Sequence, residues 1–110
     1  HVTYSGWTVT TGGRQVHVRP NGTLRSCTAP TEMIAVGRVV RAVKGQRYVD
    51  TFTHGSKRVA RYVDTWAGSG AYADSWGFFA HGFTNGTWRT KLTRGKTTIG
   101  TESITIRCSA

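Results

Sequence analysis

The sequence contains few acidic residues, only two cysteines and no long hydrophobic run. Five Asp and Glu stand against fifteen Lys and Arg, which gives a formal net charge of +10 at pH 7. So large an excess of cations favours polyanionic partners such as nucleic acid, acidic lipids or cell-wall polymers. No apolar stretch approaches the roughly 20 residues of a membrane-spanning helix, so we expect no membrane span.

Several motifs of catalysis and cofactor binding are also missing from the sequence. There is no Gly-x-Ser-x-Gly nucleophile motif, no phosphate-binding loop and no dinucleotide fingerprint. Neither Cys-x-x-Cys nor a paired histidine spacing indicates a metal site, and no helix-turn-helix or zinc-finger pattern indicates sequence-specific DNA binding. We therefore expect no cofactor and no metal, and a binding protein rather than an enzyme.

The two cysteines, Cys27 and Cys108, enclose most of the chain. This placement is typical of a covalent crosslink in an exported domain, so we expect one disulfide and a secreted, extracellular location. The alternative is a pair of buried, reduced thiols in a cytosolic protein.

The residues that are abundant indicate a β-rich fold. Hydrophobic residues make up 37% of the chain, Gly occurs 14 times and Thr is frequent, which is typical of short strands joined by many turns. A length of 110 residues suits one core. We expect a single domain, residues 1–110, with an antiparallel β-sandwich of about eight to ten strands, immunoglobulin-like or barrel-like.

Turn signals punctuate the chain. Gly12-Gly13 lies between alternating segments that contain Trp7 and Val18, and predicts a first hairpin. Asn85-Gly86 predicts a second hairpin, between Phe83 and Trp88. Residues 31–43 have the apolar spacing of either a helix or a strand, and their β-branched composition favours a strand, with a bulge at Gly37.

A short internal repeat is the most informative pattern. Residues 47–52 (RYVDTF) recur as residues 61–66 (RYVDTW), and residues 71–76 (AYADSW) are a looser third copy. A two-residue turn at Gly55-Ser56 would place Arg47 opposite Asp64, and Asp50 opposite Arg61. The charged residues of the repeat are thus interpreted as cross-strand ion pairs.

Basic and aromatic residues around this repeat are candidate binding residues. The same Tyr-x-Asp-x-aromatic pattern would place its Tyr, Asp and aromatic side chains on one face of a strand. Trp, Tyr and Arg are also the usual anchors of protein interfaces, and exposed loop tips often carry contacts. The candidates are Lys57, Arg58, Arg61, Tyr62, Trp66, Tyr72 and Trp76, with residues 67–71 as a further contact loop.

An enzymatic alternative is a small secreted ribonuclease, or an antimicrobial toxin that acts on a polyanion. Cleavage of RNA needs a general acid, a general base and a cation beside the phosphate. His17, His54 and His81 would supply acid and base, with Glu32 or Glu102 beside them.

Residues 85–108, with Trp88 and a closing SITIRC, resemble the end of bacterial immunoglobulin-like modules. The resemblance implies a bacterial sandwich domain and carries no function.

We expect a secreted, basic, non-enzymatic interaction domain, such as a protease inhibitor, a toxin-complex adaptor or a cell-surface binder. Its expected partner is a protein, and a polyanion (nucleic acid or acidic glycan) is the alternative.

Overall fold

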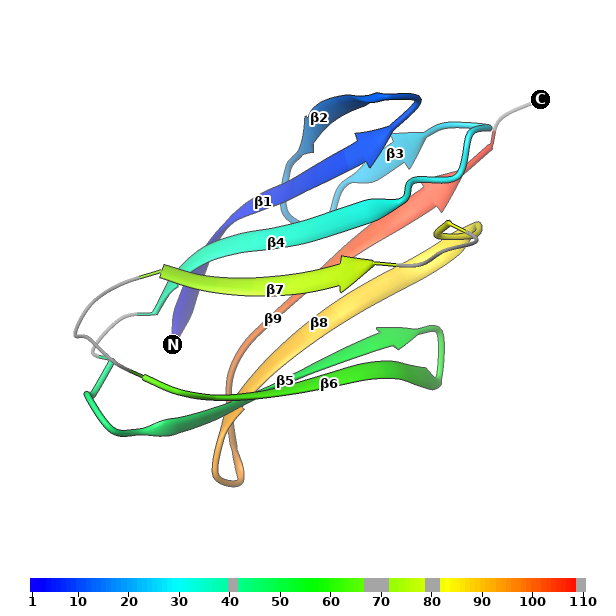
Figure 1. Ribbon diagram of the computed structural model, residues 1–110. Coiled ribbons are helices and arrows are strands. Elements are labelled where there is room, and N and C mark those ends of the chain that lie inside the picture. The colour runs from blue at the N-terminus through cyan, green and yellow to red at the C-terminus, as the bar shows by residue number, and fades with distance from the viewer. Residues whose placement is uncertain (40–41, 67–71, 79–81, 109–110) are drawn as a thin grey trace.

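Two β-sheets pack face to face and form the whole of the described structure. The computed structural model describes residues 1–39, 42–66, 72–78 and 82–108, with the backbone alone for 72–78, and every regular element within these ranges is a strand. The sheets form two layers around a common core (Figure 1). The predicted small β-sandwich is confirmed.

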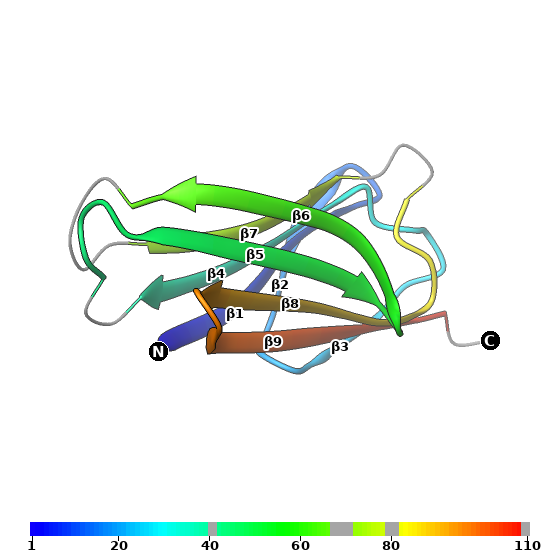
Figure 2. The ribbon, with the colours of Figure 1, turned by 90° about the horizontal axis from the view of Figure 1, so that it is seen from below.

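The described part of the chain contains nine strands. The four-stranded sheet is built from β1 (Val2–Thr11), β2 (Arg14–Val18), β4 (Glu32–Val39) and β7 (Tyr72–Phe78), in the order β2-β1-β4-β7. The five-stranded sheet is built from β3 (Thr23–Arg25), β5 (Arg47–His54), β6 (Lys57–Thr65), β8 (Gly86–Arg94) and β9 (Thr97–Arg107), in the order β3-β9-β8-β5-β6. Seen from below, β6 lies at one edge of the molecule (Figure 2).

The first hairpin forms where the sequence predicts it. Gly12 and Gly13 have φ values of +58° and +77°, the left-handed region that glycine adopts without steric cost. Thr11 consequently pairs with Arg14, and Trp7 pairs with Val18. The two-residue turn therefore sets the register that directs Trp7 into the core.

Within the ambiguous segment, residues 31–43, the strand β4 runs from Glu32 to Val39, and residues 40–41 are outside the described part of the chain. Met33, Ala35 and Val39 are buried in alternation along β4, as expected of a strand with one face in the core. The predicted bulge occurs in the neighbouring strand instead, where the register of β1 shifts between Tyr4 and Gly6. Gly37 is required for another reason, because a Cβ atom there would lie 2.8 Å from Cδ1 of Tyr4.

The hairpin of β5 and β6 turns at Gly55-Ser56 as predicted, but the expected ion pairs do not form. A bulge between Phe52 and Thr53 shifts the register. Arg47 therefore pairs with Thr65, and Asp50 pairs with Tyr62. The structural explanation of the repeat as matched charges is wrong, because one extra residue in β6 displaces every later pair by one position.

The predicted hairpin at Asn85-Gly86 is also wrong. The strand before it, β7, belongs to the four-stranded sheet, whereas β8 belongs to the five-stranded sheet, so this segment crosses between layers. Gly86, at φ +125°, lies beneath His54, where a Cβ atom would come within 2.7 Å of the imidazole Nε2. The glycine allows this close approach rather than a tight turn.

A disulfide joins Cys27 and Cys108, as the sequence predicts. The cysteines lie just beyond the carboxyl ends of β3 and β9, which run side by side and parallel, with Leu24 opposite Ile106. This short pair is parallel, whereas the other strand pairs of the described structure are antiparallel. A parallel neighbour is what brings both strand ends to the same side of the sheet.

The core consists of two apolar clusters. The larger contains Trp7, Phe52, Trp88 and Ile104 among its buried members. The smaller contains Val39, Ala42, Tyr48, Leu92 and Ile99.

A polar layer lies where the two clusters meet. It contains the buried Asp50 of β5, Thr90 of β8 and Glu102 of β9, which occupy inward positions between members of the two clusters. The half-buried Tyr4 of β1 lies near Asp50 and Glu102.

Glu102 is the least compensated member of the polar layer. Its side chain is 1% exposed, and neither carboxylate oxygen has a hydrogen-bond partner among the described residues. Burial raises the pKa of Glu102 from 4.5 to about 8, since desolvation disfavours the charged form. Burial, followed by the nearby Asp50 and Glu102, also raises the pKa of Tyr4. Asp50, by contrast, accepts a hydrogen bond of 2.6 Å from the Thr90 hydroxyl.

Candidate anion-binding face

The outer face of the five-stranded sheet combines cations with hydroxyl groups. Along β8, Trp88, Thr90 and Leu92 are buried, so Arg89 and Lys91 project outward. The same alternation applies to the neighbouring strands. We call this surface the basic face, and its cations are Arg25, Arg47, Arg58, Arg61, Arg89, Lys91 and Arg107.

The pairing register places these cations in rows across the sheet. Lys91 is directly opposite Thr51, which is opposite Arg61 on the other side. In the next row, Arg89 is opposite Thr53, and Thr53 is opposite Arg58. Adjacent strands are about 4.8 Å apart, and outward residues of one strand are about 6.8 Å apart. The rows therefore form a compact positive lattice separated by threonines.

None of the five acidic residues of the chain lies on the basic face. Asp50 and Glu102 belong to the buried polar layer, and Asp64 has the inward register of β6, opposite the buried Tyr48. Glu32 and Asp74 belong to β4 and β7 in the other sheet. Because no carboxylate neutralises this surface, its positive potential is available to an external anion.

Among the residues whose side chains the structure describes, the four-stranded sheet does not present an equivalent surface. Its strand β4 places Glu32, Ile34, Val36 and Arg38 at outward positions, which mixes an acid and two aliphatic residues with one cation. The positive charge of the chain is therefore distributed unequally between its two faces.

A hollow of about 360 Å³ opens on the basic face between β8 and β9. The residues that line it are Asn21, Arg89, Lys91, Thr98, Thr101 and Glu102. Glu102 contributes little accessible surface, because only 1% of the residue is exposed to solvent. The remaining lining consists of two cations, two hydroxyls and one carboxamide, and we call it the groove.

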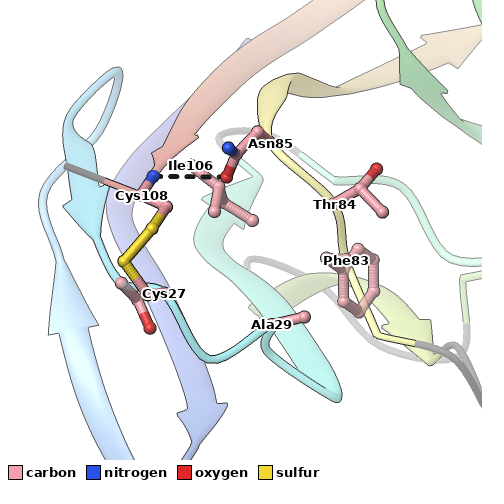
Figure 3. Close-up of a pocket in the computed structure, with 8 residues that line it drawn as sticks. Cys27, Ala29, Phe83, Thr84, Asn85, Ile106 and Cys108 are labelled. Carbon is pink, nitrogen blue, oxygen red and sulfur yellow. Dashed lines mark hydrogen bonds between the residues drawn. A yellow bond between two sulfur atoms is a disulfide. The ribbon is translucent and has the colours of Figure 1, made fainter. Parts of the chain in front are cut away.

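A second hollow, of about 430 Å³, lies beside the disulfide. Figure 3 shows Cys27 and Cys108 on one side of it and Phe83 on the other, with the carboxamide of Asn85 directed toward Cys108. The Cys108 amide donates to Asn85 Oδ1 at 3.3 Å. None of the residues that line this hollow is charged, so it offers no counterpart to the net charge of the chain.

The structure places the predicted binding residues at different positions. Lys57 and Arg58 follow the hairpin turn and are exposed, and Arg61 lies on the basic face. Tyr62 is directed to the other side of β6 and is 38% exposed. Partial burial is the larger cause that raises the pKa of Tyr62, and the charge of Asp50 is the smaller one. The predicted residues on β6 are therefore divided between its two faces.

The remaining predicted binding residues lie beyond β6 and in β7. Trp66 packs edge-on against Tyr48, with the ring centroids 5.6 Å apart, and lies against the smaller core cluster. By register, Tyr72 pairs with Arg38 and Trp76 with Ile34, but their side chains are outside the described part of the structure, as are residues 67–71.

The histidines of the ribonuclease hypothesis lie on separate elements. His17 is exposed on β2, in the four-stranded sheet, whereas His54 is at the end of β5 in the other sheet. The imidazole of His54 stacks on the Trp88 ring, with the ring centroids 3.9 Å apart. The Nε2 atom of His54 lies 2.9 Å from the Asn85 carbonyl oxygen. His81 is outside the described residues. Glu102 is enclosed in the core.

Sequence reasoning missed Asn21, Arg89 and Lys91. The pattern from Trp88 to Leu92, with apolar and polar residues in alternation, already indicates that Arg89 and Lys91 share the outer face of a strand. The contribution of Asn21 has no local signal, because it depends on a contact with β9 across 82 residues of sequence.

Comparison with known proteins finds no family whose model matches the chain, and no curated protein of similar sequence. Among the described residues, no helix is long and apolar enough to cross a membrane.

Proposed function

We propose that this protein is an exported, non-enzymatic binding domain that holds an acidic glycan against its basic face. The observation that carries the proposal is the array of arginines and Lys91 on one sheet face from which every acidic residue is absent. Arginine suits this role because its planar guanidinium binds carboxylate, sulfate or phosphate through two parallel hydrogen bonds.

The residues between the cations favour a glycan over other polyanions. Outward positions carry Thr51, Thr53, Thr101, Ser103 and Thr105, whose hydroxyls can bond to sugar hydroxyls. No aromatic side chain occupies an outward position in the described strands of this sheet. Single-stranded nucleic acid normally requires such rings for base stacking, so RNA is the less suitable polyanion.

Export is part of the same proposal. The Cys27–Cys108 disulfide is compatible with an extracellular location, where acidic polysaccharides of cell surfaces would be accessible. The strong positive charge would increase the rate of encounter with such a polymer.

The experiment is retention on immobilised polygalacturonate as the NaCl concentration rises, with uncharged amylose and with RNA as comparison matrices. The triple variant Arg58→Gln, Arg61→Gln, Lys91→Gln removes three cations from the basic face. The control variant Arg14→Gln, Arg38→Gln, Lys44→Gln removes the same charge elsewhere.

We expect the basic-face variant to lose at least about tenfold in affinity for polygalacturonate at 0.15 M NaCl, since hydrogen bonds to charged groups contribute about 1.5 to 3 kcal/mol each. The control variant should lose less than about threefold. Equal losses would show that only net charge matters and would refute a localised binding face. Retention on RNA but not on polygalacturonate would make the partner a nucleic acid.

A protein partner is the second candidate, and the exposed edge strand β6 favours it. Tyr62 and Val63 are 38% and 45% exposed, and β6 has a paired neighbour on one side only. Such an edge can accept an additional strand from a partner. An inhibitor of a trypsin-like protease would instead use Lys57 or Arg58 at the hairpin, and changing both to Ala should then abolish inhibition.

A further inference from the structure

The side chain of Asn21, in the turn between β2 and β3, is fixed by two hydrogen bonds to Ser103. Its Oδ1 accepts the Ser103 amide at 3.0 Å and the Ser103 hydroxyl at 3.1 Å. A backbone N–H can only donate, so the atom that faces it must be the carboxamide oxygen. The Nδ2 group is consequently the part of the side chain that Ser103 does not engage, and Asn21 borders the groove.

The backbone around Asn21 is held as firmly as its side chain. The residue has φ +58°, a left-handed conformation that asparagine tolerates better than most residues. The turn is closed by a 3.0 Å bond from the Gly22 amide to the Arg19 carbonyl, and the Thr105 amide donates to the Gly22 carbonyl at 3.0 Å. Such rigidity lowers the entropic cost of binding a ligand.

Arg89 and Lys91 supply the charge of the groove. They lie two residues apart on β8, about 6.8 Å along the strand, and both border the groove. With the Nδ2 group of Asn21 they form a set of donors suited to an oxyanion. The groove is lined by one acidic residue, Glu102, which is 1% exposed.

Thr101 gives the groove a complementary property. Its hydroxyl donates to the Thr90 carbonyl at 3.1 Å, so the proton of Thr101 is already committed and its oxygen is left as an acceptor. An acceptor beside cationic donors does not suit a bare anion, but it suits a ligand that has a hydroxyl next to its anionic group.

We infer that the groove is a binding site for one acidic sugar unit, a saccharide that bears a carboxylate, sulfate or phosphate together with neighbouring hydroxyls. Asn21, Arg89 and Lys91 bind the oxyanion, and Thr101 accepts a sugar hydroxyl. This inference rests on the proposed function and deepens it, because it specifies where on the basic face a single unit of the polymer is recognised.

The test uses isothermal titration at 0.15 M NaCl with trigalacturonate, neutral maltotriose, tripolyphosphate and triglutamate as probes. The variants are Asn21→Asp, Thr101→Val and the double variant Arg89→Gln, Lys91→Gln. The matched control is Arg25→Gln, Arg107→Gln, which removes two cations from the same face but outside the groove. Circular dichroism and melting temperature confirm that each variant is folded.

We expect the wild type to bind trigalacturonate and not maltotriose. Asn21→Asp keeps the acceptor for Ser103 but replaces the donor by a negative charge, so it should weaken trigalacturonate binding at least about tenfold. The groove double variant should do the same, and the control double variant should lose less than about threefold. Thr101→Val should weaken trigalacturonate binding at least about threefold and leave tripolyphosphate binding unchanged.

Three outcomes would overturn the inference. Equal losses in the groove and control double variants would show that the groove is not a site. Loss in Asn21→Asp without any effect of Thr101→Val, or tighter binding of triglutamate, would make it an oxyanion or acidic-peptide site instead of a sugar site. Failure of the wild type to bind even polygalacturonate would instead refute the proposed function itself.

Discussion

The buried carboxyl group of Glu102 should make the stability of this protein fall as pH rises. In the folded protein its pKa is about 8, against an ordinary value of 4.5, because burial penalises the charged form. Between these two values the folded state retains a proton that the unfolded chain has released. The associated stability is therefore complete below pH 4.5 and is lost as pH rises through 8.

The size of the effect follows from the same two values. Their difference is 8 − 4.5 = 3.5 pH units, and each unit corresponds to about 1.36 kcal/mol, so the upper limit is about 5 kcal/mol. Local relaxation around a buried charge reduces such penalties, and we expect roughly 2 to 4 kcal/mol. Glu102→Gln removes the titrating group while keeping nearly the same shape.

The assay is urea denaturation followed by tryptophan fluorescence at pH 5, 6, 7, 8 and 9, with the disulfide intact. The relevant quantity is the difference in unfolding free energy between Glu102→Gln and the wild type at each pH, because contributions from other titrating groups cancel in it. This difference should be near zero at pH 5 and should reach its full value, in favour of the variant, at pH 8 to 9.

Glu32→Gln is the control, since Glu32 is half-buried at the start of β4, outside the polar layer. A gain of the same size with rising pH in Glu32→Gln would show that the effect does not come from the buried carboxyl group of Glu102. The explanation based on burial of Glu102 would be wrong if the difference in unfolding free energy stayed constant from pH 5 to 9. It would also be wrong if the wild type became more stable relative to Glu102→Gln as the pH rose.

Three further predictions follow from the fold. Gly37→Ala should lower the unfolding free energy by about 1 to 3 kcal/mol in urea denaturation, because its Cβ would lie 2.8 Å from the Tyr4 ring; an unchanged midpoint would contradict this packing. Reduction of the disulfide, which spans 81 residues, should cost about 4 to 5 kcal/mol, and an unchanged melting temperature would contradict that estimate. Purified, oxidised protein should not degrade RNA at catalytic ratios, and cleavage abolished by His54→Ala would restore the ribonuclease hypothesis.

The repeated hexapeptide shows the limit of local reasoning most clearly. Tyr48 and Asp50 in its first copy are buried, whereas Tyr62 and Asp64 in its second copy are exposed. The two copies have nearly the same sequence, so their propensities are the same. Their burial differs because β5 lies between β6 and β8, while β6 lies at the sheet edge.

Two predictions are wrong for similar reasons: the ion pairs between β5 and β6, and the hairpin at Asn85-Gly86. The extra residue in β6 that displaces the ion pairs has no marker in the sequence, since a bulge is decided by packing on both faces of the strand. The sequence around Gly86 indicates a turn. In the structure, this glycine with its positive φ instead allows a close approach to His54 of a different strand.

The strands and turns, the single disulfide and the strong positive charge are all predictable from the amino-acid sequence. Alternation of apolar and polar residues, glycine pairs and cysteine placement are local or pairwise signals, so these features could be predicted. The gathering of cations on one sheet face, the contact of Asn21 with β9 and the burial of Glu102 without a hydrogen-bond partner among the described residues are visible only in the folded protein. These features depend on which strands become neighbours, and that choice is made by the packing of the whole core.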